Sequence, residues 1–191
     1  SGGTLSDAKI DAAGTIHMVA VGGNVLYSAL PAGSSQWAVW ADVSQTSQST
    51  GSPQMALANN GGVIAVWRER NPGDSYDSMK ATRLVGNQWL TPVRIEEVLT
   101  DVNSDSNPRL ASDTNGNAVA AWHQGDSLYV NRFDAATGTW GTATEVDSKQ
   151  VDSTFSAGIK IAMAPDGRAV IAWKSGLFAL KAMTYSPSGG F

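Results

Sequence analysis

Short apolar runs, separated by polar turn residues, recur along the whole chain. The clearest example lies between residues 107 and 140, where an alternating run at 109–112 precedes the turn Asp113-Thr114-Asn115-Gly116. An apolar run at 118–122 and a second alternating run at 128–133 follow this turn. Glycine, asparagine and aspartate at the breaks favour tight turns, and the residues between the breaks suit strands. This pattern predicts a meander of short antiparallel strands.

The meander is one of four copies of a repeated unit. Glycines of the first turn are spaced by 47, 55 and 51 residues: Gly14, Gly61, Gly116 and Gly167. The aromatic residues that end the second hairpin are spaced by 52, 51 and 51 residues: Trp37, Trp89, Trp140 and Phe191. Such regular intervals indicate a repeat architecture, in which stacked copies bury a shared core. We therefore expect one domain over residues 1–191, built from repeats at approximately 7–46, 53–99, 108–148 and 159–191.

Each copy is expected to supply strands A to D. Strand A is predicted at 8–11, 54–58, 109–112 and 159–163. Strand B is predicted at 16–21, 62–68, 117–123 and 168–174. Strand C is predicted at 24–30, 78–85, 127–133 and 177–185. Strand D is predicted at 37–43, 89–96 and 140–146. Strand B is apolar on both faces, as in a strand that lies between two other sheets. The prediction is an all-β protein, a β-propeller of four four-stranded blades of about 51 residues each.

The fourth copy lacks its outer strand, so closure of the ring needs a separate explanation. Residues 3–6 could supply this strand and close a four-bladed ring. The alternative is a larger ring completed by another chain or by flanking sequence, which makes this chain an assembly module or a homo-oligomer. The chain starts without a methionine, and we expect it to be a piece of a longer protein.

The repeats resemble those of bacterial secreted and cell-surface β-propeller proteins. Residues 108–122 and 159–173 are similar to the family pattern P-x-φ-A-x-D-x-x-G-N-A-φ-A-φ-W, in which φ is apolar, and residues 133–140 are similar to its D-x-x-x-G-x-W hairpin. The resemblance implies a propeller fold and an extracellular or cell-surface location. The hairpin is also distantly similar to the Asp box of sialidase-like propellers, which is a stabilising turn, and no catalytic residue is implied.

Composition excludes several kinds of site and partner. The net charge of −4 disfavours nucleic acid, which requires a basic surface. The absence of cysteine excludes disulfides and thiolate chemistry. No apolar run approaches the length of about 18–20 residues that a membrane-spanning helix needs.

The connection between strands B and C of the second copy is the strongest candidate for a ligand site. It is longer than in the other copies and carries charged and aromatic residues: Arg68, Glu69, Arg70, Asp74, Tyr76 and Asp77. Irregular loops on a regular scaffold often carry function, and the alternative is a solvated loop that costs little to form. We expect this loop to contact a glycan or a protein.

Three further residues are candidate ligand contacts. His123 and Lys174 match Arg68 in position, so the three are expected to surround the mouth of the propeller on one face. Trp40 has no counterpart in the other copies and is expected to be exposed. By contrast, Trp67, Trp122 and Trp173 recur at the end of strand B and are expected to fill the space between blades.

A calcium site is a weaker hypothesis, and it rests on Asp101, Asn103 and Asp105. Their alternating oxygen ligands resemble the start of a calcium loop, but the sixth position is serine, not glycine, and the twelfth is serine, not glutamate. A polar loop between blades is the alternative, and no other cofactor is expected.

Taken together, these residues predict a non-catalytic extracellular binding or adhesion module that recognises a glycan or a surface protein. A structural or assembly module is the first alternative. A glycosidase-like enzyme is the second, and it lacks support because Glu96 and Glu97 point to opposite faces of a strand and cannot act on one bond.

Overall fold

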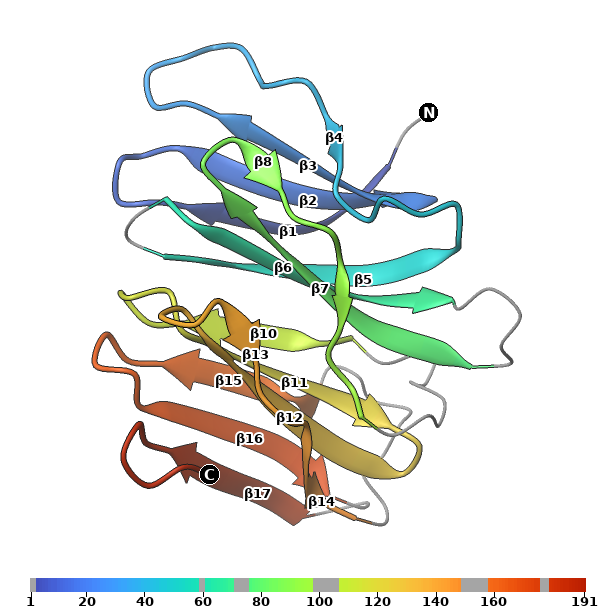
Figure 1. The fold of residues 1–191 in the computed structure, drawn as a ribbon, viewed down its shortest axis with the longest axis vertical. Coiled ribbons are helices and arrows are strands. Elements are labelled where there is room, and N and C mark those ends of the chain that lie inside the picture. Colours follow the sequence, from blue (N-terminus) through green and yellow to red (C-terminus); the bar gives the residue numbers. More distant parts are fainter. Residues whose placement is uncertain (1–2, 59–60, 71–75, 98–106, 149–157, 176–178) are drawn as a thin grey trace.

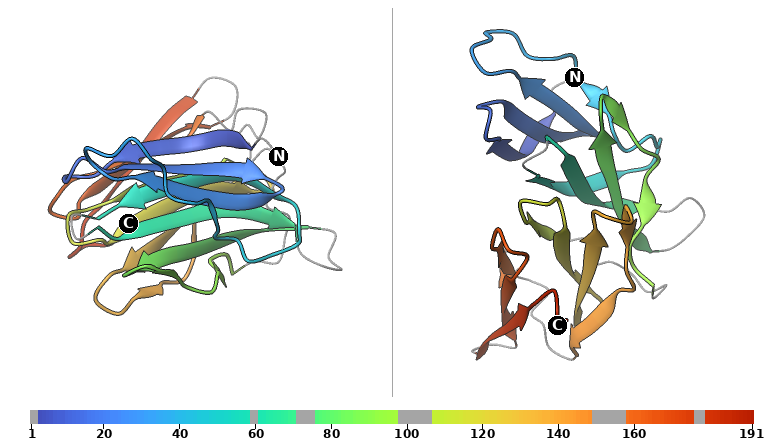
Figure 2. Two further views of the ribbon diagram at one scale, coloured as in Figure 1. Left: turned by 90° about the horizontal axis from the view of Figure 1, so that it is seen from above. Right: turned by 60° about the vertical axis from the view of Figure 1, so that its left-hand side comes forward.

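The computed structural model describes residues 3–58, 61–70, 76–97, 107–148, 158–175 and 179–191. Within these ranges the chain forms four antiparallel sheets and no α-helix. None of the described segments is a helix that could cross a bilayer. The sheets follow one another in chain order, so that sheet 1 and sheet 4 lie at opposite ends of the molecule (Figure 1). Other views show the strands of successive sheets rotated against one another (Figure 2).

Each sheet is a meander that contains one copy of the repeat. Sheet 1 contains β1 (Thr4–Ile10), β2 (Ile16–Gly22), β3 (Asn24–Leu30) and β4 (Ala41–Asp42). Sheet 2 contains β5 (Thr50–Leu57), β6 (Val63–Arg70), β7 (Asp77–Val85), β8 (Gln88–Trp89) and β9 (Val93–Arg94). Sheet 3 contains β10 (Arg109–Ser112), β11 (Ala118–Gln124), β12 (Ser127–Asp134), β13 (Thr139–Trp140) and β14 (Thr144–Asp147). Sheet 4 contains β15 (Lys160–Met163), β16 (Ala169–Ser175) and β17 (Ala179–Tyr185).

The predicted A, B and C strands occur in all four sheets, within a few residues of their predicted positions. The turn glycines also have the backbone that the repeat requires, with φ of +78° at Gly61 and +87° at Gly116, a region that suits glycine. The outer strand D differs from the prediction because it is broken into two short pieces in sheets 2 and 3. In sheet 2 the break includes Pro92, which has no N–H to donate to the ladder.

The prediction that residues 3–6 close the last blade is wrong in this structure. Thr4 and Leu5 belong to β1 and pair with Val21 and Ala20 of β2 in sheet 1. The physical reason is that β2 extends for seven residues, from Ile16 to Gly22. The backbone N–H and C=O groups near its C-terminal end need hydrogen-bond partners, and β1 supplies them by starting at Thr4. Sheet 4 therefore has three strands among the described residues.

Apolar cores join each sheet to the next, and the packing follows one rule. We define the even face of a sheet by the residues two, four and six positions after its turn glycine, and the odd face by those three and five positions after it. The even face of sheet 2 packs on sheet 1, the even face of sheet 3 on sheet 2, and the even face of sheet 4 on sheet 3. The odd face of the preceding sheet is the partner each time.

The tryptophans of strand B end these even faces. Trp67 and Trp122 are fully buried and Trp173 is nearly so, which confirms that they pack between sheets. Each indole N–H is also satisfied, by Glu69, Gln124 and Asp147 respectively.

The inner strands are joined by side chains that bind the free edge of a neighbour. Asp7 accepts a hydrogen bond from the backbone N–H of Met55, with 3.1 Å between O and N. Ser112 donates to the carbonyl of Leu57 at 2.7 Å, and the Nε of Arg109 donates to a carbonyl at the start of sheet 4 at 3.2 Å. These contacts satisfy edge groups that would otherwise invite pairing with other chains.

Candidate functional site

The elongated B–C hairpin of sheet 2 is more regular than the sequence indicates. Arg68, Glu69 and Arg70 lie in β6 and Asp77 begins β7, where Arg70 and Asp77 pair directly. Asp77 is buried and forms ion pairs with Arg68 and with Arg70, the latter at 3.2 Å. The prediction of a loop is therefore wrong for Glu69, Arg70 and Asp77, because the ion pairs hold the two strands together to their ends, whereas Arg68 lies at the end of strand B as predicted.

Only part of this hairpin is open to a ligand. Glu69 is buried and accepts a hydrogen bond from the Trp67 indole at 3.0 Å. The Arg70 side chain is 48% exposed and Tyr76 is half-buried. Asp74 lies outside the described residues. Ligand binding by Arg70 and Tyr76 stays a prediction.

The other predicted contacts are not equally exposed. His123 is 3% exposed at the end of β11, so the expectation of an accessible side chain at the mouth is wrong for it. The reason is that β11 is buried along its whole length between neighbouring sheets. Lys174 is half-buried. The expected exposure of Trp40 is confirmed at 45%, and its role as a ligand contact stays a prediction.

The predicted calcium ligands Asp101, Asn103 and Asp105 lie outside the described residues. Within the described ranges, no three histidine or carboxylate side chains gather closely enough to hold a metal ion.

A cleft between sheets 2 and 3 was not predicted from the sequence. It has a volume of about 280 Å³ and opens at the end of the sheets that carries the turns around Gly61 and Gly116. Sheet 2 contributes Ile64, Arg83 and Val85 to its walls, and sheet 3 contributes Ser112, Asn115, Gly116 and Phe133.

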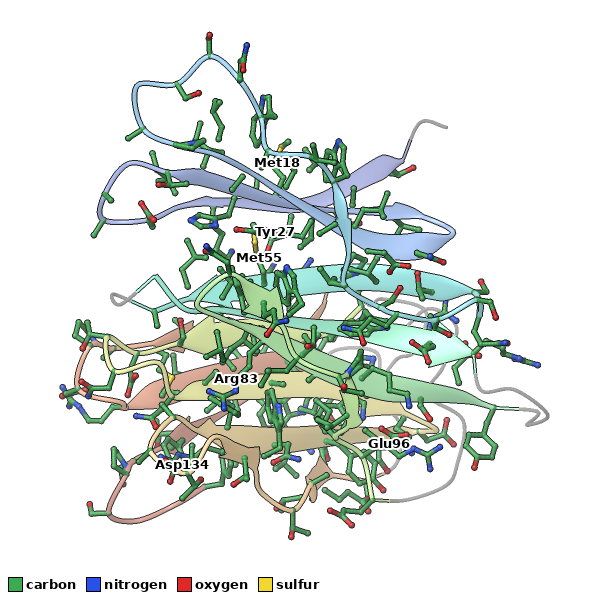
Figure 3. The ribbon with its side chains drawn as sticks, turned by 45° about the horizontal axis from the view of Figure 1, so that its top comes forward. Met18, Tyr27, Met55, Arg83, Glu96 and Asp134 are labelled. Atoms are coloured by element: carbon green, nitrogen blue, oxygen red, sulfur yellow. The ribbon has the colours of Figure 1, made fainter. Side chains whose placement is uncertain are left out.

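Arg83 is the charged group of this cleft. It lies on β7 opposite Ile64, on the odd face of sheet 2, and it extends among the side chains between sheets 2 and 3 (Figure 3). Its guanidinium carbon lies 5.5 Å from the centre of the Phe133 ring, in a cation–π contact. Among the described residues, no carboxylate forms an ion pair with Arg83.

A second cleft lies at the equivalent place between sheets 3 and 4. It is smaller, at about 170 Å³, and Arg132 occupies the position of Arg83. Arg132 lies opposite Val119 on β11 and contacts the ring of Tyr185, with 5.9 Å to its centre. Unlike Arg83, it has side-chain partners: it donates to Asp134 and to the Asn117 amide oxygen, each at 3.3 Å.

The carboxylate of Asp134 remains ionised beside this arginine. The backbone N–H of Ala136 and the Arg132 guanidinium both lower the pKa of Asp134. Asn117 in turn accepts from the backbone N–H of Ala135 at 3.0 Å and donates to Asp113 at 2.7 Å. The cleft between sheets 3 and 4 is therefore neutralised and crosslinked by its own side chains.

The two clefts differ in sequence at two equivalent positions. Asp134 lies two residues after Arg132, and Val85 lies two residues after Arg83. Asn117 follows Gly116, and Gly62 follows Gly61. An alignment of the copies around Arg83 and Arg132 could have revealed this difference. It could not have shown that Phe133, which lies in the next repeat, contacts Arg83.

Sheet 1 contains a chain of hydrogen bonds that resembles an acid–base relay. Tyr27 and His17 share a hydrogen bond of 2.7 Å, and the other ring nitrogen of His17 lies 3.2 Å from Asp11. Burial, with a further contribution from Asp11, raises the pKa of Tyr27 to about 12, so its hydroxyl stays protonated. Both ring residues are buried, and we interpret the chain as a support for the turn at Gly14.

No protein-family model matches the sequence. No curated protein matches it either.

Several solved structures share the fold. A protein of unknown function from Dyadobacter fermentans has a TM-score of 0.62 at 11% identity, over 95% of this chain and 59% of its own. The intramolecular trans-sialidase of Ruminococcus gnavus has a TM-score of 0.56 at 11% identity, over 95% of this chain and 43% of its own. TolB from Acinetobacter baumannii has a TM-score of 0.56 at 11% identity, over 99% of this chain and 42% of its own.

These comparisons show a propeller-type fold and nothing about activity, because the identities are very low. They support the coarser half of the fold prediction, an all-β protein of propeller type with four sheets. The chain spans between two fifths and three fifths of the length of these three proteins.

Proposed function

We propose that this chain is a non-catalytic binding module and that the cleft between sheets 2 and 3 receives the carboxylate of an acidic sugar. The observation that carries the proposal is Arg83, a guanidinium without a carboxylate partner among the described residues, in a cleft of about 280 Å³. Arginine presents a fork of N–H donors that matches a carboxylate.

The rest of the cleft suits a single sugar residue. Its volume lies near the lower limit, about 300 Å³, of ordinary ligand pockets. Ile64, Val85 and Phe133 offer apolar surface for the C–H groups of a sugar ring, and Asn115 and Ser112 bring polar groups for its hydroxyls. Such a mixture of apolar walls and a few polar groups is typical of small-molecule sites.

The setting and the wider contact surface are also part of this proposal. We infer an extracellular or cell-surface location from the resemblance of the repeats to bacterial secreted propellers. Arg70 and Tyr76 at the far end of sheet 2 could contact a longer glycan or a surface protein. Binding by the proposed cleft needs no cofactor, and the calcium hypothesis for Asp101, Asn103 and Asp105 stays a prediction.

Titration with galacturonate oligosaccharides tests the proposal. We expect the amide NMR signals of Gly116 and Phe133 to shift in the wild type, and we expect neutral galactose oligosaccharides to leave them unchanged. Arg83→Gln should weaken binding about tenfold or more, since a hydrogen bond to a charged group is worth about 1.5–3 kcal/mol.

Arg168→Gln is the matched control, because Arg168 is exposed and pairs with Asp166 away from this cleft. It should bind like the wild type. Absence of any shift, or equal binding by Arg83→Gln, contradicts the proposal, and binding of acidic peptides instead of acidic sugars would assign the cleft to a protein ligand.

A further inference from the structure

A second, smaller cavity lies beside the cleft that contains Arg83. It has a volume of about 70 Å³ and also lies between sheets 2 and 3. Three side chains line both the cleft and this cavity, so the two spaces share a wall: Ile64, Arg83 and Phe133. The remaining walls of the smaller cavity are mainly apolar and include Ala81, Leu90, Val93 and Trp140.

A difference between two repeats accounts for this cavity. Between sheets 1 and 2, Tyr27 packs edge-on against Trp89, with 5.0 Å between ring centres. Tyr27 and Ala81 are equivalent, because each lies opposite the residue five positions after the turn glycine of its sheet. Trp89 and Trp140 are likewise equivalent residues of the outer hairpins. Ala81 therefore leaves open, in front of Trp140, the space that the Tyr27 ring fills in front of Trp89.

The Arg83 guanidinium lies where the cleft and the cavity meet. It contacts the Phe133 ring, with 5.5 Å between the guanidinium carbon and the ring centre. It also lies against the backbone of Gly138, where an added Cβ would be only 2.6 Å from a terminal nitrogen of Arg83. A side chain at residue 138 would thus displace the guanidinium. A carboxylate bound by Arg83 has the smaller cavity next to it.

We propose that the smaller cavity binds the methyl group of a methyl ether on the acidic sugar, at the ring carbon next to the one that carries the carboxylate. This inference rests on the proposed function of the cleft. The substituent must be close to the carboxylate, because Arg83 borders both spaces. The cavity is large enough for a methyl group, since about 10–15 Å³ already holds one water molecule.

The cavity favours a methyl ether over a free hydroxyl. The Thr82 hydroxyl lines the cavity, but it donates to the carbonyl of Leu90 at 2.5 Å, so its proton is not free for a ligand. A sugar hydroxyl that enters apolar surroundings loses its hydrogen bonds to water. A methyl group loses none and gains contacts with the side chains that line the cavity.

The methyl glycosides of 4-O-methylglucuronate and glucuronate test this inference, because the two ligands differ by one methyl group. We expect the wild type to bind the methylated sugar about fourfold more tightly, as the burial of one methyl-sized group predicts. The side-chain NMR signals of Val93 and Trp140 should shift with the methylated sugar alone. The amide signal of Gly116, at the larger cleft, should shift with both sugars.

Two variants fill the smaller cavity. Ala81→Phe supplies a ring like that of Tyr27 and should bind the two sugars equally. Val93→Trp should also remove the preference, and it replaces Ala81→Phe if circular dichroism shows that this variant does not fold. Val93 lies opposite Ala81 on β9 and is 50% exposed, so a larger side chain can be accommodated there. Val39→Trp is the matched control, because Val39 is 92% exposed on sheet 1, and it should keep the fourfold preference.

The possible failures can be told apart. Equal binding of the two sugars by the wild type overturns this inference and leaves the proposed function of the cleft in place. A preference that persists in the cavity-filling variants overturns it as well, because the methyl group then binds elsewhere. Binding of neither sugar overturns the proposed function and this inference together.

Discussion

The clefts on either side of sheet 3 are built alike and differ in charge. In each, an arginine on strand C of one sheet lies against an aromatic ring of the next, Arg83 on Phe133 and Arg132 on Tyr185. Between sheets 3 and 4, Asp134 and Asn117 bind the guanidinium. Between sheets 2 and 3, valine and glycine stand at these two positions, and the cleft is larger.

This difference separates scaffold from site. The arginine on an aromatic ring belongs to the repeat, since it stabilises both interfaces through a cation–π contact. Of these two interfaces, only the one between sheets 2 and 3 lacks the carboxylate, so the Arg83 guanidinium can bind the carboxylate of a ligand. In a repeat protein, a departure of one copy from its neighbours thus carries more functional information than the shared pattern.

The largest expected effect is the loss of stability when the buried tryptophan of either interface is removed, and it tests whether the two interfaces are built alike. Trp122→Ala and Trp173→Ala remove the buried indoles between sheets 2 and 3 and between sheets 3 and 4. Each should lower the free energy of unfolding by about 3–5 kcal/mol, as expected for a buried tryptophan. Trp37→Ala should cost much less, because its side chain is 41% exposed. Denaturant unfolding measures all three, and a marginal effect of Trp122→Ala contradicts the comparison.

The intermediate effect is a loss of stability at acidic pH, which we expect to arise from the interface between sheets 3 and 4. There Asp147 accepts from the Trp173 indole at 2.6 Å and from Lys181 at 2.8 Å. Burial alone would raise the pKa of Asp147, but these hydrogen bonds outweigh it and hold the pKa below its ordinary value. The unfolded chain therefore binds a proton more readily, so this stability is present above about pH 4 and is lost as the pH falls through the folded pKa.

Asp147→Asn should remove this pH dependence and lower the free energy of unfolding at pH 7 by about 1–2 kcal/mol. Unfolding in urea between pH 3 and pH 7 measures both quantities. The equivalent indole of Trp122 donates to the neutral Gln124 instead. Asp126→Asn, at the exposed end of the hairpin that contains Trp122, is the control, and we expect it to leave the stability at pH 7 unchanged. An unchanged pH profile in Asp147→Asn would refute the assignment.

The smallest expected effect is a gain of function in the second cleft. Asp134→Ala, made together with Arg83→Gln, removes the carboxylate from Arg132. Weak binding of galacturonate oligosaccharides should appear between sheets 3 and 4, visible as shifts of the Gly167 and Tyr185 amide signals. Affinity stays low because Asn117 still accepts from Arg132 and the cleft is smaller. Binding as tight as in the wild-type first cleft would show that cleft size is unimportant.

Most of the fold could be predicted from the sequence, because each strand's signal lies within a few residues of it. The turn glycines and the apolar runs of strand B locate β2, β6, β11 and β16. The start of β1 at Thr4 and the breaks in the outer strands could not be predicted, since they depend on which edge offers hydrogen bonds.

The candidate site was harder to predict than the fold. Glu69 and Arg70 were expected in a loop, but they pair with β7, where Arg70 lies opposite the buried Asp77. His123 looked accessible in sequence and is buried by a neighbouring sheet. The cleft joins Arg83 to Phe133, which lies fifty residues away along the chain, and only the packing of sheets 2 and 3 brings them together.

The central claim is that Arg83 binds a ligand because it has no carboxylate neighbour, and introducing a carboxylate beside it is the most direct test. Val85→Asp gives Arg83 the partner that Arg132 has in Asp134, two residues along the same strand. Val85→Asn supplies a side chain of the same shape without the charge. The account predicts that Val85→Asp loses at least tenfold in affinity for galacturonate oligosaccharides, as Arg83→Gln does, while Val85→Asn retains binding. Wild-type affinity in Val85→Asp would contradict it.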